Sequence, residues 1–250
     1  MIHEELNAVK PRITLDDIEP PIWRRLVAPL NWRLDQLHLA IQAAFNWWNS
    51  HLHEFRIGGL RYGDPDVEDV SFEDSPPLFD EREVTLRDFG HDPSVRFVYT
   101  YDLGDNWRHI VEIEEWLTLD DTPRFAACLD GARARPPEDA GGVSGYEAFL
   151  EIMSDPLDAE HTEMKRWCGG HFDPEWFDLG WVDRDVRNAL RANARRRLHQ
   201  PKPRNTGHDQ RHHRPRRCPS VGCIGFDHPL DWPRNGQEMT EAMDRRKYRK

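Results

Sequence analysis

The chain has 250 residues, enough for one sizeable domain or one domain with an extension, and ten tryptophans compensate for a hydrophobic content of 38%. Residues 191–250 hold 16 Lys and Arg against 6 Asp and Glu, whereas residues 1–190 carry a net charge of −21. Because phosphate contacts need Lys and Arg, this acidic body excludes nucleic-acid binding through its general field. Four cysteines give no dense disulfide framework.

The N-terminus lacks the basic-then-apolar pattern of a secretory signal. No run of about 18 apolar residues occurs anywhere in the chain. We therefore expect a cytoplasmic protein without a membrane span.

The first third of the chain alternates extended and helical patterns. Val9 to Val27 reads as extended, with Pro20 and Pro21 predicting a bulge or an edge strand. Leu34 to Trp47 has apolar residues at helical spacing, and a short strand is expected at His53 to Ile57 before a Gly-Gly turn. The acidic, Pro-rich residues that follow predict a solvated loop over Asp64 to Glu83, and Thr85 is expected to cap a short helix.

The clearest local pattern is YTYDLGDNWRH, Tyr99 to His109. Apolar residues alternate with polar ones on both arms, and the connecting turn contains Gly104, so the pattern predicts a β-hairpin. Tyr99, Tyr101, Trp107 and His109 should share the packed face, with Asp102 on the opposite one.

The rest of the body predicts a strand at Phe125 to Leu129 and three helices. The expected helices are Tyr146 to Met153, Leu157 to Trp167 and Asp183 to Leu198. Together these patterns predict one α+β domain over residues 1–199, with a mixed or antiparallel sheet, a central β-hairpin and packed helices.

Residues 200–250 have a different composition. The first part has no large apolar residue, so we expect a basic and mostly disordered tail that contacts nucleic acid nonspecifically. Cys218, Cys223 and His228 loosely resemble a zinc knuckle, and an altered reading-frame end fits the composition equally.

Two histidines, His51 and His53, lie just before and at the start of the predicted short strand. In an extended segment His51 and His53 point to the same face, where two imidazoles can bind a divalent transition metal such as zinc. The alternative is a helix-to-strand junction with two partly exposed histidines, because a bare H-x-H motif is weak.

The hairpin supplies three further candidates. Asp102 and Asp105 can act as metal ligands or as a general acid–base pair, although Asp is also an ordinary turn residue. His109 titrates near neutral pH by default, but a lone histidine on an apolar face is more often a core residue.

The segment from Cys128 to Asp139 contains adjacent carboxylates in a Gly-rich loop. Glu138 and Asp139 can coordinate a cation or stabilise the start of the next helix. Cys168 and His171 are half a zinc site, and a turn explains their spacing better. No nucleotide-binding loop, serine nucleophile elbow or H-E-x-x-H motif is present.

Four segments in order resemble the plasmid pRi ORF-three-like family, whose members are often labelled transposon passenger proteins of the TnpR type. They are PPIWRRLVAP (20–29), FNWWNSHLHEF (45–55), YTYDLGDNWRHIVEIE (99–114) and CLDGARARPPEDAGGVSGYEAFLE (128–151). The resemblance implies an α+β domain encoded near mobile elements. The first 30 residues contain no serine, which argues against a serine resolvase.

The resemblance also implies that relatives add cysteines at the positions of Arg135 and Ala140, where they can form a metal site with Cys128. This chain keeps only Cys128. The leading interpretation is a non-catalytic accessory or binding protein associated with mobile elements. The alternative is a metal-dependent hydrolase that uses His51, His53 and the hairpin tip.

Overall fold

The computed structural model describes residues 6–66, 76–90, 95–191 and 200. The chain divides into two units, Met1–Gln200 and Pro201–Lys250, and the second unit lies outside the described residues. The predicted tail and its cysteines therefore stay predictions. Among the described helices, none has the length and hydropathy needed to cross a membrane.

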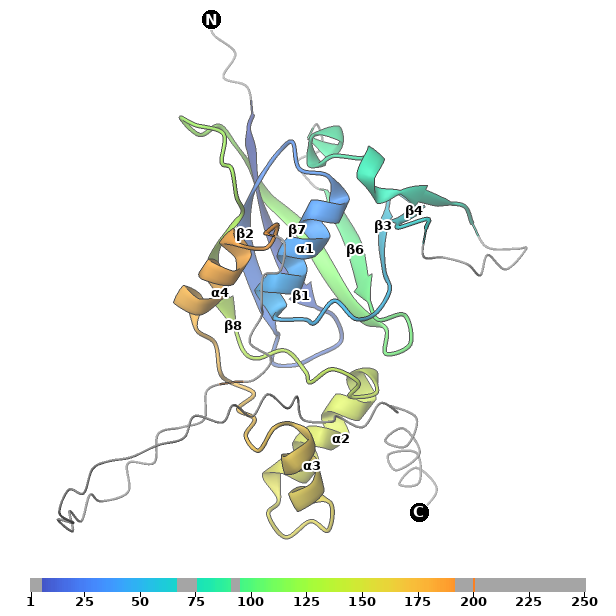
Figure 1. Ribbon diagram of the computed structural model, residues 1–250, viewed down its shortest axis with the longest axis vertical. Coiled ribbons are helices and arrows are strands. Elements are labelled where there is room, and N and C mark those ends of the chain that lie inside the picture. Colours follow the sequence, from blue (N-terminus) through green and yellow to red (C-terminus); the bar gives the residue numbers. More distant parts are fainter. Residues whose placement is uncertain (1–5, 67–75, 91–94, 192–199, 201–250) are drawn as a thin grey trace, which may run out of the picture. The chain divides into compact units, whose positions relative to one another are not determined.

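The first unit is built on one eight-stranded sheet with the order β5-β4-β3-β6-β7-β1-β2-β8 (Figure 1). Only the β4–β5 pair is parallel, so the sheet is mixed and mostly antiparallel. The strands are β1 (Ala8–Leu15), β2 (Trp23–Pro29), β3 (His53–Ile57), β4 (Leu60–Gly63), β5 (Leu78–Asp80), β6 (Arg96–Tyr101), β7 (Trp107–Leu117) and β8 (Ala127–Ala132). This arrangement confirms the predicted α+β class.

Four α-helices and two short 3-10 helices complete the described fold. Helices α1 and α4 pack together on one face of the sheet, and α4 also packs against β8 (Figure 1). The elements are α1 (Leu34–Phe45), α2 (Gly142–Ser154), α3 (His161–Trp167), α4 (Leu179–Arg187), η1 (Glu81–Glu83) and η2 (Leu86–Phe89). The predicted cap at Thr85 is confirmed, because its backbone N–H donates to the side chain of Asp88.

The predicted hairpin is confirmed and occupies the middle of the sheet as β6 and β7. Its register pairs Tyr99 with His109 and Tyr101 with Trp107. These four side chains are fully buried against α1 and the segment that follows it, since alternation places every second residue on the same face. The hairpin is therefore the scaffold from which its turn projects.

Two sequence predictions were wrong in the first half of the chain. The run from Val9 to Val27 is two antiparallel strands, because the chain reverses around a cis Glu19–Pro20 peptide bond. In the predicted loop Asp64 to Glu83, the described residues include β5 and η1, and Glu81 is buried, whereas residues 67–75 lie outside the described part of the chain.

Helix ends differ from the predictions in the second half. Helix α2 begins at Gly142, α3 is shorter than predicted, and α4 begins at Leu179 because Asp178 caps it through the Trp181 backbone N–H. Two polar side chains, His38 and Gln42, are also buried on the inner face of α1. Their helical spacing places them on that face, but it does not show which groups they contact there.

Candidate metal centre

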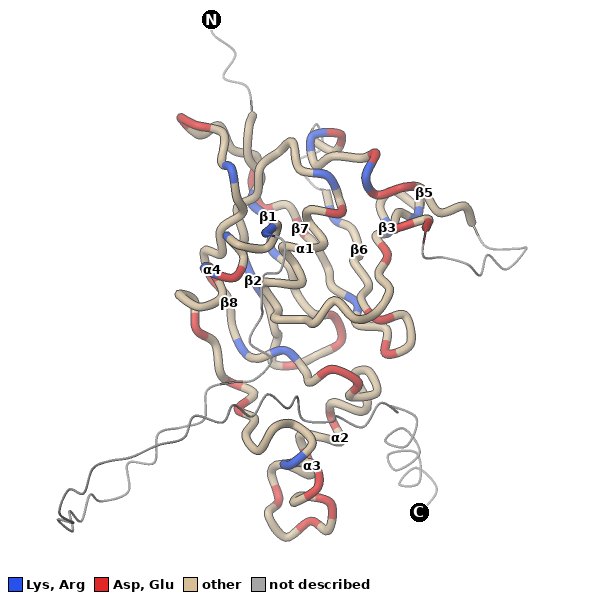
Figure 2. The backbone as a smooth tube through the Cα atoms, viewed as in Figure 1, with Lys and Arg blue, Asp and Glu red and all other residues tan. Residues whose placement is uncertain are grey.

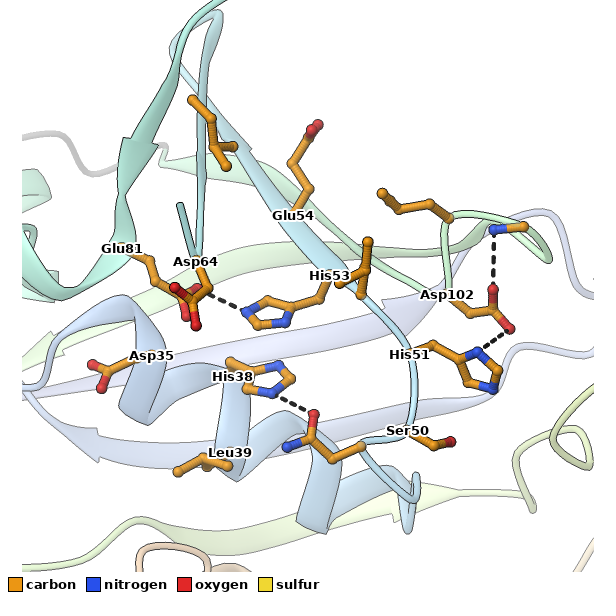
Figure 3. Close-up of a pocket in the computed structure, with 15 residues that line it drawn as sticks. Asp35, His38, Leu39, Ser50, His51, His53, Glu54, Asp64, Glu81 and Asp102 are labelled. Atoms are coloured by element: carbon orange, nitrogen blue, oxygen red, sulfur yellow. Dashed lines mark hydrogen bonds and ion pairs between the residues drawn. The ribbon is translucent and has the colours of Figure 1, made fainter. Parts of the chain in front are cut away.

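A groove of about 680 Å³ lies between α1, the segment leading into β3, and the β6–β7 turn. Its described lining holds three histidines and several carboxylates but no Lys or Arg (Figure 3). The polar lining residues are Asp35, His38, Asn49, Ser50, His51, His53, Glu54, Asp64, Glu81 and Asp102. The residues from Asp80 to Glu83, at the β5 edge of the sheet, comprise three carboxylates and one arginine, and Figure 2 shows acidic residues in this region.

His51 lies two residues before β3, at one end of the groove. Its side chain is 30% exposed, so the imidazole is accessible without being free in solvent. Three carboxylates surround the ring. Nδ1 lies 3.5 Å from Asp102 Oδ2, and Nε2 lies 3.3 Å from Asp139 Oδ1 and 4.0 Å from Glu138 Oε2.

Asp102 reaches His51 because strand β6 ends at Tyr101. Asp102 then adopts a left-handed conformation with φ of 55°, which Asp tolerates better than most residues. Its Oδ1 accepts hydrogen bonds from the backbone N–H groups of Gly104 and Asp105, and Oδ2 is left facing His51 (Figure 3). The sequence prediction placed Asp102 on the face opposite Tyr101, whereas the Asp102 carboxylate and the Tyr101 ring both lie against His51.

Asp139 arrives from a loop that docks on the hairpin turn. The Gly141 backbone N–H donates to Asp105 Oδ2 at 3.1 Å. A Cβ on Gly142, whose φ is 69°, would lie 2.7 Å from the Asp105 carbonyl oxygen, so this contact requires glycine. Asp105 thus holds the loop against the turn through its side chain, and the Gly142 backbone packs closely against the Asp105 carbonyl.

One His and two Asp side chains form a candidate ligand group. Nitrogen and oxygen donors from His51, Asp102 and Asp139 all lie within 4.8 Å of one another, and no other such group occurs among the described residues. Zinc–ligand bonds are about 2.1 Å, so donors on one ion are at most about 4.2 Å apart. A small inward movement of these side chains satisfies that limit, and the mixed imidazole and carboxylate set suits Zn²⁺ or Mn²⁺.

Glu138 is the buried neighbour of this group. Its Oε1 accepts the Trp48 backbone N–H at 2.6 Å, and its Oε2 accepts the Tyr101 hydroxyl at 3.4 Å. Burial raises the pKa of the Glu138 carboxyl, and the Arg135 guanidinium at 3.9 Å opposes that increase. Burial also raises the pKa of Tyr101 to about 12 and, together with the Asp102 charge, raises the pKa of Asp105.

His53 lines the opposite end of the groove and does not join the ligand group. Its Nε2 lies 2.8 Å from Glu81 Oε2, and its ring stacks on His38 with centroids 3.5 Å apart and planes 8° from parallel. The two histidines of the H-x-H motif therefore line one groove, as expected from their spacing, but pair with different carboxylates (Figure 3).

His109 lies in the core, where its ring packs against Phe45 and Trp47. Its Nδ1 donates to the Trp107 carbonyl at 2.9 Å, and its Nε2 accepts the Trp47 indole N–H at 3.2 Å. Burial lowers the pKa of His109 to about 3, so the ring is neutral at pH 7. The structure does not bring His109 into the ligand group.

Cys128 lies on β8, away from the groove. Its backbone N–H donates to Asp183, its Sγ lies 3.5 Å from the Asp130 carbonyl, and burial raises the pKa of its thiol to about 11. Cys168 is half-buried beside its own turn, and its Sγ lies 3.3 Å from the Lys165 carbonyl. Neither cysteine belongs to the candidate ligand group.

Sequence reasoning missed Glu81, His38 and Asn49 in the groove. Glu81 lay within a segment predicted to be a solvated loop, and nothing in its neighbours signals burial. His38 lay on the apolar stripe of its helix, which was the available signal that a polar residue faces inward.

The fold and the groove define the class: an α+β protein with a candidate divalent-metal site made by one histidine and two aspartates. The chain belongs to the plasmid pRiA4b ORF-3-like family, whose sequence model matches residues 7–180. This confirms the predicted family. The family description does not mention a transposon or a resolvase, so the TnpR label stays a prediction.

Two relatives carry names without an assigned activity. The chain is 40% identical over 164 residues to "Uncharacterized protein y4hQ" of Sinorhizobium fredii, covering 65% of this chain and 81% of the relative. It is also similar to the crystal structure of a "Protein of Unknown Function MM3350" from Methanosarcina mazei Go1. That match has 35% identity and a TM-score of 0.61 over 70% of this chain and 97% of the other.

Proposed function

We propose that this protein binds a divalent transition metal through His51, Asp102 and Asp139 and hydrolyses a ligand that occupies the adjoining groove. The observation that carries the proposal is the convergence of three ligand-type side chains, from three distant segments, within 4.8 Å at a groove of about 680 Å³. A metal ion bound there supplies Lewis-acid activation of water near neutral pH.

The surrounding residues have supporting roles. Glu138 lies beside the His51 ring and holds the preceding backbone at Trp48, so it restricts the orientation of the imidazole. Asp105 holds the loop of Asp139 against the hairpin turn. The groove beyond His51 provides space for a small ligand or a peptide segment.

The first experiment measures metal binding. Purified full-length chain is dialysed against Zn²⁺ or Mn²⁺ and then analysed for bound metal, and we expect one ion per chain. The Asp102→Asn variant should lose that ion, because Asn keeps the turn hydrogen bonds but lacks the charge. Asp35→Asn is the matched control, since Asp35 lies in the same groove but pairs with Arg33. Equal metal content in both variants would contradict the site.

The second experiment measures turnover. The metal-loaded chain is assayed with chromogenic esters, phosphodiesters and peptides, with chelator and Asp102→Asn as controls. We expect hydrolysis that requires both the metal and Asp102. Metal binding without hydrolysis of any substrate class would remove the enzymatic part of the proposal.

The second candidate function is a non-catalytic accessory or binding protein associated with mobile elements. The observation that favours it is the same groove, whose polar lining can hold a ligand without reaction. This function predicts ligand-dependent stabilisation of the chain that persists after the metal is removed.

A further inference from the structure

A closed ring of hydrogen bonds links α1, β6 and the segment that joins α1 to β3, which includes His51. The Asn49 backbone N–H donates to Gln42 Oε1 at 2.9 Å, and Gln42 Nε2 donates to the Tyr99 hydroxyl oxygen at 2.9 Å. The same hydroxyl lies 2.8 Å from His38 Nδ1, and His38 Nε2 lies 2.8 Å from Asn49 Oδ1. The chain of contacts therefore returns to Asn49, where it began.

The direction of this ring follows from one group that can only donate. Because the Asn49 backbone N–H has no acceptor character, the Gln42 oxygen must face it, and the Gln42 NH₂ must face Tyr99. The Tyr99 oxygen accepts there, and the same hydroxyl contacts His38 Nδ1. His38 Nε2 faces Asn49 Oδ1, which can only accept, so this nitrogen carries a proton and donates it.

Burying polar side chains such as His38 and Gln42 costs free energy, so their presence in the core suggests that they hold a particular backbone conformation. His38 and Gln42 are one helical turn apart on the buried face of α1, where apolar side chains would pack without any need for partners. Connected hydrogen bonds of this kind strengthen one another and specify one geometry. The residue that it fixes is Asn49, which has a left-handed φ of 55°.

The backbone around Asn49 is held at three successive positions. The N–H groups of Trp48, Asn49 and Ser50 donate to the side chains of Glu138, Gln42 and Tyr101 at 2.6, 2.9 and 3.1 Å. The next residue is His51. The segment thus enters the candidate metal centre with its backbone anchored by side chains from three other elements.

We propose that His38, Gln42, Tyr99 and Asn49 are positioning residues that set His51 for metal coordination. This inference rests on the proposed function for its consequence, although the ring can be tested without metal. Breaking the ring at Tyr99 frees the backbone at Asn49 and lets the His51 imidazole leave the geometry shared with Asp102 and Asp139. Supporting hydrogen bonds of this kind change metal affinity by about 10- to 100-fold.

The first test reads the ring directly in the metal-free, full-length chain. Nitrogen-15 NMR of the His38 ring should show a proton on Nε2. A ring without a proton on Nε2 at pH 7 overturns the hydrogen bond to Asn49 Oδ1 and with it the ring.

The second test compares two Tyr→Phe variants. Tyr99→Phe should weaken Co²⁺ binding about tenfold and change the visible absorption spectrum of bound Co²⁺. Tyr146→Phe is the matched control, because the Tyr146 hydroxyl is buried without a hydrogen-bond partner in the described structure, and it should bind Co²⁺ like the natural chain. In a His51→Ala background, Tyr99→Phe should cause no further loss of affinity.

The outcomes separate the two proposals. Unchanged Co²⁺ affinity and spectrum in Tyr99→Phe overturn the positioning role while leaving the metal site intact. If the natural chain binds no Co²⁺, Zn²⁺ or Mn²⁺, the proposed function fails, and the proton on His38 Nε2 alone then decides whether the ring exists.

Discussion

The two ends of the groove contain the same chemical groups in different states. At one end, His53 bonds Glu81 at 2.8 Å and stacks on His38, so its imidazole is fixed by close contacts. At the other end, His51 is surrounded by Asp102, Asp139 and Glu138 at 3.3–4.0 Å. Those distances are longer than ordinary hydrogen bonds.

The lengths of these contacts distinguish His53, which has a structural role, from His51, the candidate metal ligand. A buried imidazole in tight hydrogen bonds has already replaced its water contacts and gains little from a ligand. An accessible imidazole among several carboxylates has lone pairs that make no short hydrogen bonds. Binding a cation there lowers the free energy of the whole group. The spacing of His51 and His53 in the sequence is identical for both interpretations, so only the surroundings distinguish them.

We expect the largest change in metal affinity from replacing His51, and almost none from replacing His53. His51→Ala removes one of three ligands, so Zn²⁺ affinity should fall by at least about 100-fold, which corresponds to about 2.7 kcal/mol. His53→Ala should change affinity by less than about threefold. Competition against a chromophoric chelator measures both values, and equal losses would show that the two ends act together.

The next effect concerns His109, the buried histidine on β7. Burial lowers the pKa of His109 to about 3, whereas the unfolded chain binds a proton near pH 6.5. Its contribution to stability is therefore complete above pH 6.5 and decreases as the pH falls toward 3. Between pH 7.5 and 5 this decrease is about 2 kcal/mol.

Replacing His109 with Gln tests this pH dependence. Gln keeps an oxygen acceptor for Trp47 but does not titrate, so the free energy of unfolding should depend less steeply on pH than in the natural chain. Urea unfolding at several pH values measures the two slopes. Parallel curves would mean that folding does not lower the pKa of His109.

A smaller effect is expected at the His53 end. Glu81→Leu removes the partner of His53 from a position that is 4% exposed, so unfolding should become easier by about 1.5 kcal/mol. Metal affinity should stay within about twofold of the natural chain. Thermal unfolding and metal titration on the same sample provide both numbers, and lost metal binding would place Glu81 in the site.

The smallest expected effect concerns the contact that brings Asp139 to the site. Asp105→Ala removes the acceptor of the Gly141 N–H, so Zn²⁺ affinity should fall about tenfold, or about 1.4 kcal/mol. Asp105→Asn keeps an acceptor oxygen and serves as the matched variant with near-natural affinity. A loss in the Asn variant as large as that in Ala would mean that the charge, rather than the docking, matters.

Much of the fold could be predicted because its signals are local. Alternation in the hairpin identified the buried faces of Tyr99 and Trp107, and helical spacing identified α1. The short strands β4 and β5 were missed, because three or four residues are too few to show a period. The helix ends shifted because capping at Asp178 and the turn at Gly142 override the apolar pattern.

Most of the candidate site residues were named from the sequence, but their grouping was not. The sequence placed His51 with His53 and placed Asp102 with Asp105. The structure instead joins His51 to Asp102 and Asp139, and it makes Asp105 a docking residue. No local pattern encodes this grouping, since it depends on a left-handed turn at Asp102 and on a loop about 35 residues further along the chain.

The α+β class, the central hairpin and the family follow from periodicity and ordered motifs, which are properties of contiguous residues. Which histidine is accessible depends instead on contacts between residues far apart in the chain. His51 and His53 are the same type of residue and lie two positions apart in the sequence. Long-range packing gives them different partners. His53 contacts the buried Glu81, whereas His51 lies among several carboxylates that are more loosely arranged.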